Sequence, residues 1–222
     1  MDALKNGLRS ICNNSQSCAQ LIEPRFEEII KVLQLYINEI ELFNNVYGLV
    51  SYRDKNELVI KHILDSVAAA GIIADKLPDK ASVSIADAGS GAGLPGIPLA
   101  AVFSHVQFTL IERMERRSDF LQNTTAVLNL KNTIIIQSDL SAVAASGFDL
   151  ITFRAFHPLD LKLYKQLKSR LSPTGFIAAY KGRIKNIQQE MNSLPVKPLF
   201  WEIIPCEVPF LNEERHILII KP

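Results

Sequence analysis

The amino-acid sequence predicts an α/β protein, in which a helical extension precedes a seven-stranded sheet whose last strand pair is antiparallel. Three observations lead to this prediction. Strand and helix patterns alternate after residue 80, and a glycine-rich turn joins the first strand to the next helix. The last two apolar runs follow each other with no helix between them. Alternation indicates parallel strands joined by helices, and direct succession indicates an antiparallel pair.

Residues 1–80 carry helical periodicity. From Pro24 onward, apolar residues recur at spacings of three and four, namely Phe26, Ile29, Ile30, Leu33, Ile37 and Ile40. A break at 44–48 and a second helix over about 55–70 follow. Residues 1–20 are polar and mixed, so we expect only a short or frayed helix there. The prediction is an N-terminal helical extension over 1–80 and a sheet domain over 81–222.

The remaining elements are expected in a regular order. Strands are predicted at about 82–87, 106–112, 134–137, 148–153, 176–180, 201–207 and 216–220. Helices are predicted at about 96–103, 115–129, 158–171 and 183–192, with a turn at Pro173 and Gly175 before the fifth strand. Four polar residues fall at strand ends, where parallel sheets bind their ligands: Asp87, Glu112, Asp139 and Arg154.

The turn after the first strand, DAGSGAGLPGIP, fits two nucleotide-binding patterns. Gly91, Gly93 and Gly96 match the G-x-G-x-x-G of dinucleotide-binding folds. Asp87, Gly89, Gly91 and Gly93 match D-x-G-x-G-x-G, which resembles motif I of S-adenosylmethionine (SAM)-dependent methyltransferases. Glycine lets a ligand lie against the backbone, and the following helix start offers free N–H groups. The second pattern is favoured because Asp87 could hold the ammonium group of a methionine moiety.

Glu112 lies 21 residues after Gly91, at the end of the second apolar run. An acid at this position can accept hydrogen bonds from both hydroxyls of a ribose, in SAM or in NAD(P). The number and order of the predicted strands distinguish between a SAM-binding and an NAD(P)-binding protein. Seven strands with a terminal antiparallel pair resemble the Rossmann-like sheet of class I SAM-dependent methyltransferases. A dinucleotide dehydrogenase usually needs a separate substrate domain, and the pattern of strands leads us to expect none here.

Composition bounds the class of protein. The chain is 48% hydrophobic and 21% charged, with a formal net charge of +1. No apolar run approaches the roughly 20 residues of a membrane helix, and the N-terminus does not resemble a signal peptide. We therefore expect a cytoplasmic protein, with a monomer as the default state. Cys12, Cys18 and Cys206 match no metal or redox spacing and are expected to be reduced and structural, and the scattered histidines predict no metal site.

One stretch of the sequence is strongly basic. Residues 160–185 carry seven Lys and Arg side chains and one acid, Asp160. Such a surface can engage phosphate groups, or it can be a solvated helix face. Both interpretations stay open.

Six segments resemble the RsmG (GidB) family in order and in register: KHILDS (61–66), DAGSGAGLPGIPLA (87–100), ERMERRSDFLQ (112–122), FRAFHPL (153–159), YKG (180–182) and ERHILII (214–220). The resemblance implies a bacterial, cytoplasmic methyltransferase that uses SAM to methylate N7 of a guanine in the 530 loop of 16S ribosomal RNA. The implied partner is the small ribosomal subunit, with no membrane and no metal involved.

The resemblance also implies roles for individual residues. Gly89 and Leu94 match cofactor-binding positions of the glycine turn, and Glu112 matches the ribose-binding acid. Leu140 and Ser141 match the segment that lines the adenine. Arg154 matches an arginine at the cofactor cleft beside the substrate, and Arg215 matches an arginine implicated in RNA handling or catalysis. Departures are Lys61 in place of arginine, Gly48 and Val50 in place of polar residues, and Asp139 in place of a basic residue.

Guanine N7 carries a lone pair and no proton, so its methylation requires no general base. The product gains positive charge, and we therefore predict that Arg154 and Arg215 position the substrate through phosphates or the O6 edge of the base. Asp139 is either an adenine ligand or a turn residue, and Phe156 either stacks on the base or packs in the core. For His62 and Asp65, we favour a local hydrogen bond that anchors the extension over a role at the cleft mouth.

Two other functions stay open at this point. One is an NAD(P)-dependent oxidoreductase, and the other is a non-catalytic ribosome-binding protein that retains a SAM pocket. Stabilisation by SAM rather than NAD(H) would separate the first, and binding without turnover would indicate the second.

Overall fold

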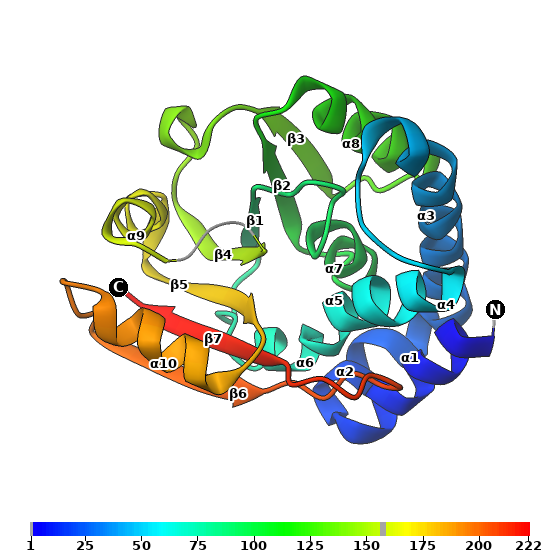
Figure 1. Cartoon of the computed structure of the whole chain (residues 1–222), viewed down its shortest axis with the longest axis horizontal. Coiled ribbons are helices and arrows are strands. Elements are labelled where there is room, and N and C mark those ends of the chain that lie inside the picture. Colours follow the sequence, from blue (N-terminus) through cyan, green and yellow to red (C-terminus); the bar gives the residue numbers. More distant parts are fainter. Residues whose placement is uncertain (1, 156–158) are drawn as a thin grey trace.

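The computed structural model describes residues 2–155 and 159–222 and contains a seven-stranded sheet in the order β3-β2-β1-β4-β5-β7-β6 (Figure 1). The strands are β1 Ser84–Ala88, β2 Gln107–Glu112, β3 Thr133–Gln137, β4 Phe148–Arg154, β5 Leu171–Lys181, β6 Phe200–Pro205 and β7 His216–Lys221. The first five pair in parallel, whereas β7 is antiparallel to both β5 and β6. This confirms the predicted sheet and its antiparallel last pair.

The helices before the sheet are α1 Asp2–Asn14, α2 Gln16–Ile22, η1 Glu23–Arg25, α3 Phe26–Tyr47, α4 Lys55–Leu58, η2 Val59–Leu64, α5 Asp65–Ala68 and α6 Ala70–Ala74. Those within the sheet region are α7 Gly96–Val102, α8 Glu115–Val127, η3 Leu140–Ala142, α9 Leu161–Lys168 and α10 Ile184–Ser193. None of the helices in the described ranges is long and apolar enough to cross a membrane.

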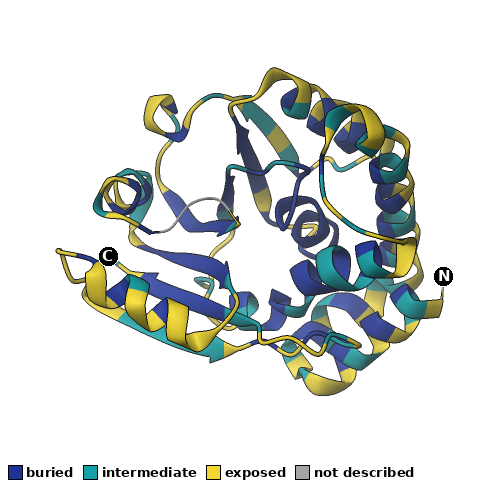
Figure 2. Ribbon diagram, viewed as in Figure 1, coloured by how far each residue is buried: buried dark blue, intermediate teal, exposed yellow. Residues whose placement is uncertain are grey.

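The two faces of the sheet pack against two separate hydrophobic clusters. Side chains alternate along a strand, so Ile85 joins one cluster while the neighbouring Ala86 joins the other. The first cluster also contains α1–α3, α7 and α8, and the second contains α9 and α10. In Figure 2 the buried residues fill the inner strands of the sheet and α7, whereas the edge strands β3 and β6 are partly exposed and α10 presents an exposed outer side. The helical extension therefore shares its core with the sheet, and its division from the sheet at residue 80 stays a prediction.

The expectation of a short or frayed helix over residues 1–20 is wrong. The segment forms α1 and α2, and α1 buries Leu4, Leu8, Ile11 and Cys12 along one face. These residues lie four, three and one apart, which forms an apolar stripe despite the polar composition. Ser15 caps α2 by accepting a hydrogen bond from the Cys18 N–H at 3.2 Å.

The single helix expected over 55–70 is interrupted by a π-helical segment. It runs as α4, the π-helix η2 and α5 in direct succession. Such wide turns occur frequently at functional sites, and η2 carries Lys61 and His62. Local periodicity does not reveal an extra residue in one turn, so this π-helix could not be predicted from the pattern of apolar residues.

The turn expected at Pro173 and Gly175 is also wrong, because both lie within β5. The pairing of β4 with β5 shifts between Phe148 and Leu150, which absorbs the irregular residues in the strand. Helix α9 begins later than predicted because Asp160 caps it, accepting from the Leu163 N–H at 2.7 Å.

Candidate functional site

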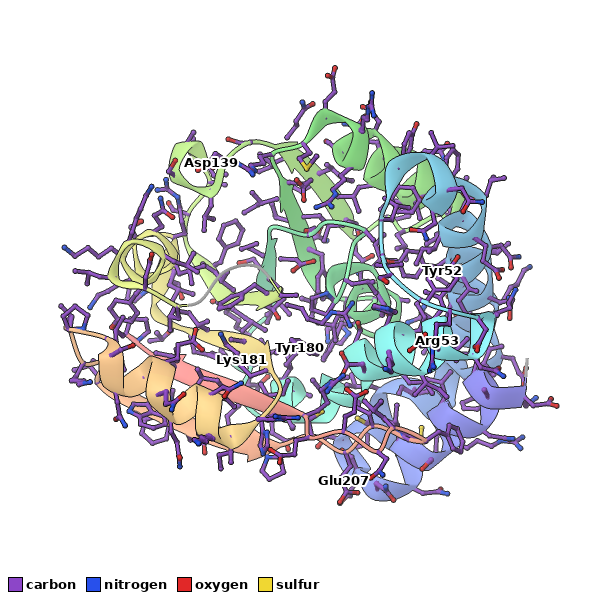
Figure 3. The ribbon with its side chains drawn as sticks, in the orientation of Figure 1. Tyr52, Arg53, Asp139, Tyr180, Lys181 and Glu207 are labelled. Atoms are coloured by element: carbon purple, nitrogen blue, oxygen red, sulfur yellow. The ribbon has the colours of Figure 1, made fainter. Side chains whose placement is uncertain are left out.

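A large cleft of about 1310 Å³ opens at the carboxyl ends of the parallel strands. It is lined by residues 89–92, the connection 49–53, and His62, Asp65, Arg154 and Arg215. A small pocket of about 550 Å³ adjoins it and is lined by Glu112, Asp139 and Leu140. Gly89, Arg117, Ala155 and Asp160 line both. Figure 3 shows Tyr52 and Arg53 on the connection after α3, and Tyr180 and Lys181 at the end of β5; all four line the large cleft.

The glycine turn after β1 adopts a conformation that few other residues tolerate. Gly89, Gly91 and Gly93 have φ of +68°, +58° and +93°. A Cβ on Gly93 would also lie only 2.5 Å from Ile97 Cδ1. From the extension, Tyr36 Oη donates to the Ala92 carbonyl at 2.7 Å and supports the turn from beneath. Gly89, Gly91 and Leu94 line the large cleft, whereas Gly93 packs inside and lines neither cavity.

Glu112 closes β2 and faces the small pocket. Its Oε2 accepts from the Gly91 N–H at 2.8 Å, and its Oε1 accepts from the Met114 N–H at 2.9 Å. A carboxylate has about four lone-pair positions, so both oxygens can still accept from a ligand. The two backbone bonds fix the orientation of the carboxylate toward the pocket. This geometry fits an acid that holds ribose hydroxyls.

Asp87 lies under the turn and lines neither cavity. Its side chain is completely buried, and its Oδ2 accepts from the Gly96 N–H at the start of α7 at 3.0 Å. Its Oδ1 has no hydrogen-bond partner among the described residues. Burial raises the pKa of Asp87 from 3.8 to about 7. The predicted contact with the ammonium of a methionine moiety therefore requires the turn to open, and it stays a prediction.

We expect Asp87→Asn to remove a pH dependence of stability. The folded pKa is about 7 and the ordinary value is 3.8, so between these values the folded protein holds a proton that the unfolded chain releases. The free energy of unfolding of the wild type should fall by up to about 1.4 kcal/mol per pH unit as pH rises through this window, and then level off. Urea unfolding at pH 5, 6, 7 and 8 measures the difference from Asp87→Asn; identical slopes would contradict the prediction.

Asp139, Leu140 and Ser141 follow β3 at the small pocket. Asp139 Oδ1 accepts from the Ser141 N–H at 2.9 Å and from Ser141 Oγ at 2.6 Å, and these bonds lower its pKa. The turn role of Asp139 is therefore observed, while its exposed position on the pocket wall leaves the adenine role a prediction. Leu140 lines the small pocket; Ser141 lines neither cavity.

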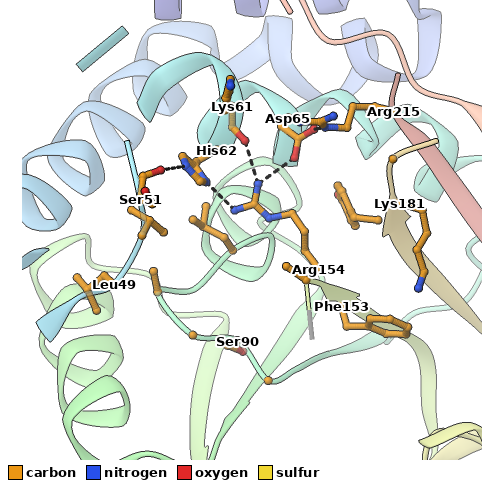
Figure 4. Close-up of a pocket in the computed structure, with 18 of the residues that line it drawn as sticks. Leu49, Ser51, Lys61, His62, Asp65, Ser90, Phe153, Arg154, Lys181 and Arg215 are labelled. Carbon is orange, nitrogen blue, oxygen red and sulfur yellow. Dashed lines mark hydrogen bonds and ion pairs between the residues drawn. The ribbon is translucent and has the colours of Figure 1, made fainter. Parts of the chain in front are cut away.

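Arg154, at the end of β4, is held by three groups of the extension (Figure 4). Its Nη1 donates to Asp65 Oδ2 at 2.9 Å and to the Lys61 carbonyl at 3.1 Å. Its Nη2 lies 3.1 Å from His62 Nδ1. Because a guanidinium only donates, His62 Nδ1 accepts, and the ring's Nε2–H donates to the Ser51 carbonyl at 3.1 Å. Burial and the charge of Arg154 lower the pKa of His62, which keeps the ring neutral.

Asp65 joins the two predicted arginines. While its Oδ2 binds Arg154, its Oδ1 accepts from Arg215 Nε at 3.0 Å. Arg215 also donates to Glu213 Oε2 at 3.0 Å and to the Glu214 carbonyl at 3.0 Å. The Asp65 side chain is 4% exposed, against 15% for Arg154 and 23% for Arg215. A single buried carboxylate thus fixes two cationic side chains that reach the cleft.

The favoured interpretation of His62 and Asp65 is therefore wrong in its detail. The two side chains do anchor the extension to the sheet, but they do so through Arg154 rather than through a hydrogen bond to each other, and both line the cleft. Their spacing of three placed them on one helix face. It did not indicate the distant arginine between them.

Other predicted residues are placed as follows. Cys12, Cys18 and Cys206 are free and buried, and burial raises the pKa of each thiol. No cluster of three or more His, Cys, Asp or Glu that could hold a metal occurs in the described ranges.

The residues that could contact RNA are placed only in part. Phe156 lies outside the described residues. In the basic stretch, Lys181 binds Glu190 at 2.7 Å, whereas five other members are exposed on or beside α9 and α10: Lys162, Lys165, Lys168, Arg183 and Lys185.

Comparison with known proteins decides the family. The model of the GidB family, described as rRNA small subunit methyltransferase G, matches residues 29–218. The chain belongs to this family. A ribosomal RNA small subunit methyltransferase G from Treponema denticola is 36% identical over 90% of this chain and 89% of its own length. One from Escherichia fergusonii is 35% identical over 84% of this chain and 86% of its own.

Solved structures confirm the class I SAM-dependent methyltransferase fold predicted for this GidB family member. A SAM-dependent methyltransferase from Aquifex aeolicus superimposes with a TM-score of 0.55 at 13% identity, covering 84% of this chain and 98% of its own. A SAM-dependent O-methyltransferase from Thermotoga maritima gives a TM-score of 0.52 at 19% identity, covering 84% and 71%. Membership in the GidB family makes the chain a methyltransferase.

Proposed function

We propose that this enzyme transfers a methyl group from SAM to N7 of a guanine in the 530 loop of 16S ribosomal RNA. The names of its relatives support small-subunit ribosomal RNA as the substrate. The residues that line the cleft support the class of reaction. The specific nucleotide rests on the family resemblance. The expectations of a cytoplasmic, monomeric enzyme accompany the proposal.

The residues around the small pocket fit the adenosine half of SAM. Glu112 offers a fixed carboxylate to the ribose hydroxyls, and Leu140 and Ile111 offer apolar surface to the adenine. Gly89 lets the ligand pass over the backbone into the large cleft. When bound, SAM supplies a methyl group on a positively charged sulfur, already activated for transfer. The protein's residues therefore have to bind, align and exclude water.

The single observation that supports guanine N7 is the absence of a free general base among the described residues of the large cleft. Both nitrogens of His62 are engaged, by Arg154 and by the Ser51 carbonyl. Three of the carboxylates bind cations: Glu57 binds Arg53 and Lys61, Asp65 binds two arginines, and Glu190 binds Lys181. Asp160 caps α9. A nucleophile that must lose a proton would need such a base, whereas guanine N7 needs none.

Arg154 and Arg215 supply the positioning contacts in this proposal. Each guanidinium has five N–H donors, and each uses three in the hydrogen bonds described. Two donors on each arginine stay available for phosphate oxygens or for guanine O6. The product carries positive charge, so the arginines act by orienting the base and not by stabilising that charge.

The decisive experiment uses small ribosomal subunits from cells that lack this protein and SAM labelled in its methyl group. After digestion of the RNA, we expect the label in 7-methylguanosine from the 530 loop. Label in another nucleoside would contradict the nucleotide proposed while keeping the methyltransferase. SAM binding with no label on subunits or free RNA would indicate a binding protein.

Glu112→Gln is expected to weaken SAM binding about 10-fold or more. An amide loses the charged acceptor, and its NH2 group opposes the N–H of Gly91 or Met114; hydrogen bonds to charged groups contribute about 1.5–3 kcal/mol. Titration calorimetry measures the Kd of SAM, with Glu115→Gln as the matched control, because Glu115 is exposed at the start of α8, three residues after Glu112, and lines neither cavity. Equal Kd values for Glu112→Gln and wild type would contradict the ribose role.

A further inference from the structure

Almost every cation that lines the large cleft is already paired with a carboxylate. Arg53 and Lys61 bind Glu57, Arg154 and Arg215 bind Asp65, and Lys181 binds Glu190. Arg117 differs. Among residues 2–155 and 159–222, it makes neither an ion pair nor a hydrogen bond, and its Nε is buried without a partner.

The position of Arg117 is specific. It lies in the first turn of α8 and lines both the large cleft and the small pocket, as Gly89 does. Its Nη1 is 3.9 Å from the place that a Cβ on Gly91 would occupy. The guanidinium therefore lies against the glycine turn where the two cavities meet. A partly buried cation with an unsatisfied donor at such a junction favours a ligand that brings a negative charge.

We propose that Arg117 binds the carboxylate of the amino-acid end of SAM. This inference rests on the proposed function. With the ribose held by Glu112 in the small pocket, the amino-acid end has to cross the glycine turn into the large cleft. Its carboxylate is the negative group of the ligand, and the planar fork of an arginine matches a planar carboxylate. Among the described residues of the cleft, Arg117 is the cation that makes neither an ion pair nor a hydrogen bond, so its whole guanidinium is open to the carboxylate.

An RNA phosphate is the competing ligand for Arg117. The location favours SAM over RNA, because Arg117 is half-buried at the junction of the cavities, whereas the exposed cations of α9 and α10 are available to a phosphate backbone. The experiment has to distinguish the two.

The test compares ligands with and without the carboxylate. Arg117→Gln and the matched control Arg116→Gln remove the same charge from adjacent positions, and Arg116 is exposed and lines neither cavity. Titration calorimetry, without RNA, measures the Kd of SAM and of decarboxylated SAM for each variant. We expect Arg117→Gln to weaken SAM binding by about 10- to 100-fold and decarboxylated SAM by less than about twofold. Arg116→Gln should change neither.

Three results would overturn the inference. Equal weakening of both ligands would give Arg117 a structural role. Unchanged SAM affinity with reduced affinity for small subunits would assign it to RNA phosphate. If Arg117→Gln left the affinities for SAM, decarboxylated SAM and small subunits all unchanged, Arg117 would have no binding role. If Arg117→Gln fails to fold, Arg117→Lys replaces it in the test, because lysine retains the charge but not the planar fork. We expect Arg117→Lys to weaken the binding of SAM, and not that of decarboxylated SAM, by a smaller factor. Absence of SAM binding in the wild type would instead contradict the proposed function.

Discussion

Asp65→Asn is expected to lower kcat by about 100-fold or more while changing the Kd of SAM by less than about threefold. An amide oxygen can accept from one arginine, but the NH2 group that replaces the other oxygen repels the second guanidinium. Arg154 and Arg215 would then lose their common anchor. Displacing positioning groups by about 1 Å can cost about 100-fold in rate. Single-turnover methylation of small subunits and calorimetry with SAM measure the two quantities.

The matched control is Asp149→Asn. Asp149 is 2% exposed on β4 and binds Lys80 Nζ at 2.7 Å. It lies at the end of β4 opposite to Arg154 and lines neither cavity. Both carboxylates are buried and accept several hydrogen bonds, which an amide cannot replace in full. Both variants should therefore unfold at a lower urea concentration than the wild type. Only Asp65→Asn should also lose rate per folded molecule. Similar rates for the two variants would contradict a positioning role for Asp65.

The second large effect is non-additivity between Asp65 and Arg154. We expect Arg154→Ala to lower kcat by about 100-fold or more, since it removes the side chain that contacts Asp65, His62 and the Lys61 carbonyl. The double variant Asp65→Asn/Arg154→Ala should be no slower than the slower single variant by more than about threefold, because the residues act as one unit. Independent effects would multiply to about 10⁴.

This double-mutant cycle is measured by the single-turnover rates of the wild type, the two single variants and the double variant. Arg116→Ala is a suitable control, since Arg116 is exposed, lies outside the basic stretch 160–185 and lines neither cavity. Multiplication of the two single effects would show that Asp65 and Arg154 act separately. Wild-type turnover in both Arg154→Ala and Arg215→Ala would contradict their positioning role altogether.

Local sequence by itself determined the sheet and the glycine turn. The alternation of apolar runs predicted all seven strands and the antiparallel last pair. Gly89 and Gly91 were placed correctly in the cleft wall, and Glu112 in the small pocket, because a strand, its turn and the next strand lie close in sequence and follow short-range rules. The position of Arg154 at the end of a predicted strand placed it at the cleft, and the resemblance to the RsmG family added Arg215; both line the cleft.

Tertiary structure alone decided how these residues work together. Asp65 meets Arg154 across 89 positions of the chain and Arg215 across 150, and no local pattern encodes such a contact. Burial of Asp87 and the unpaired state of Arg117 depend likewise on every element packed around them. Periodicity reports which face of an element is apolar. It does not report which polar side chain from a distant strand that face will contact. In this protein those long-range contacts form the site.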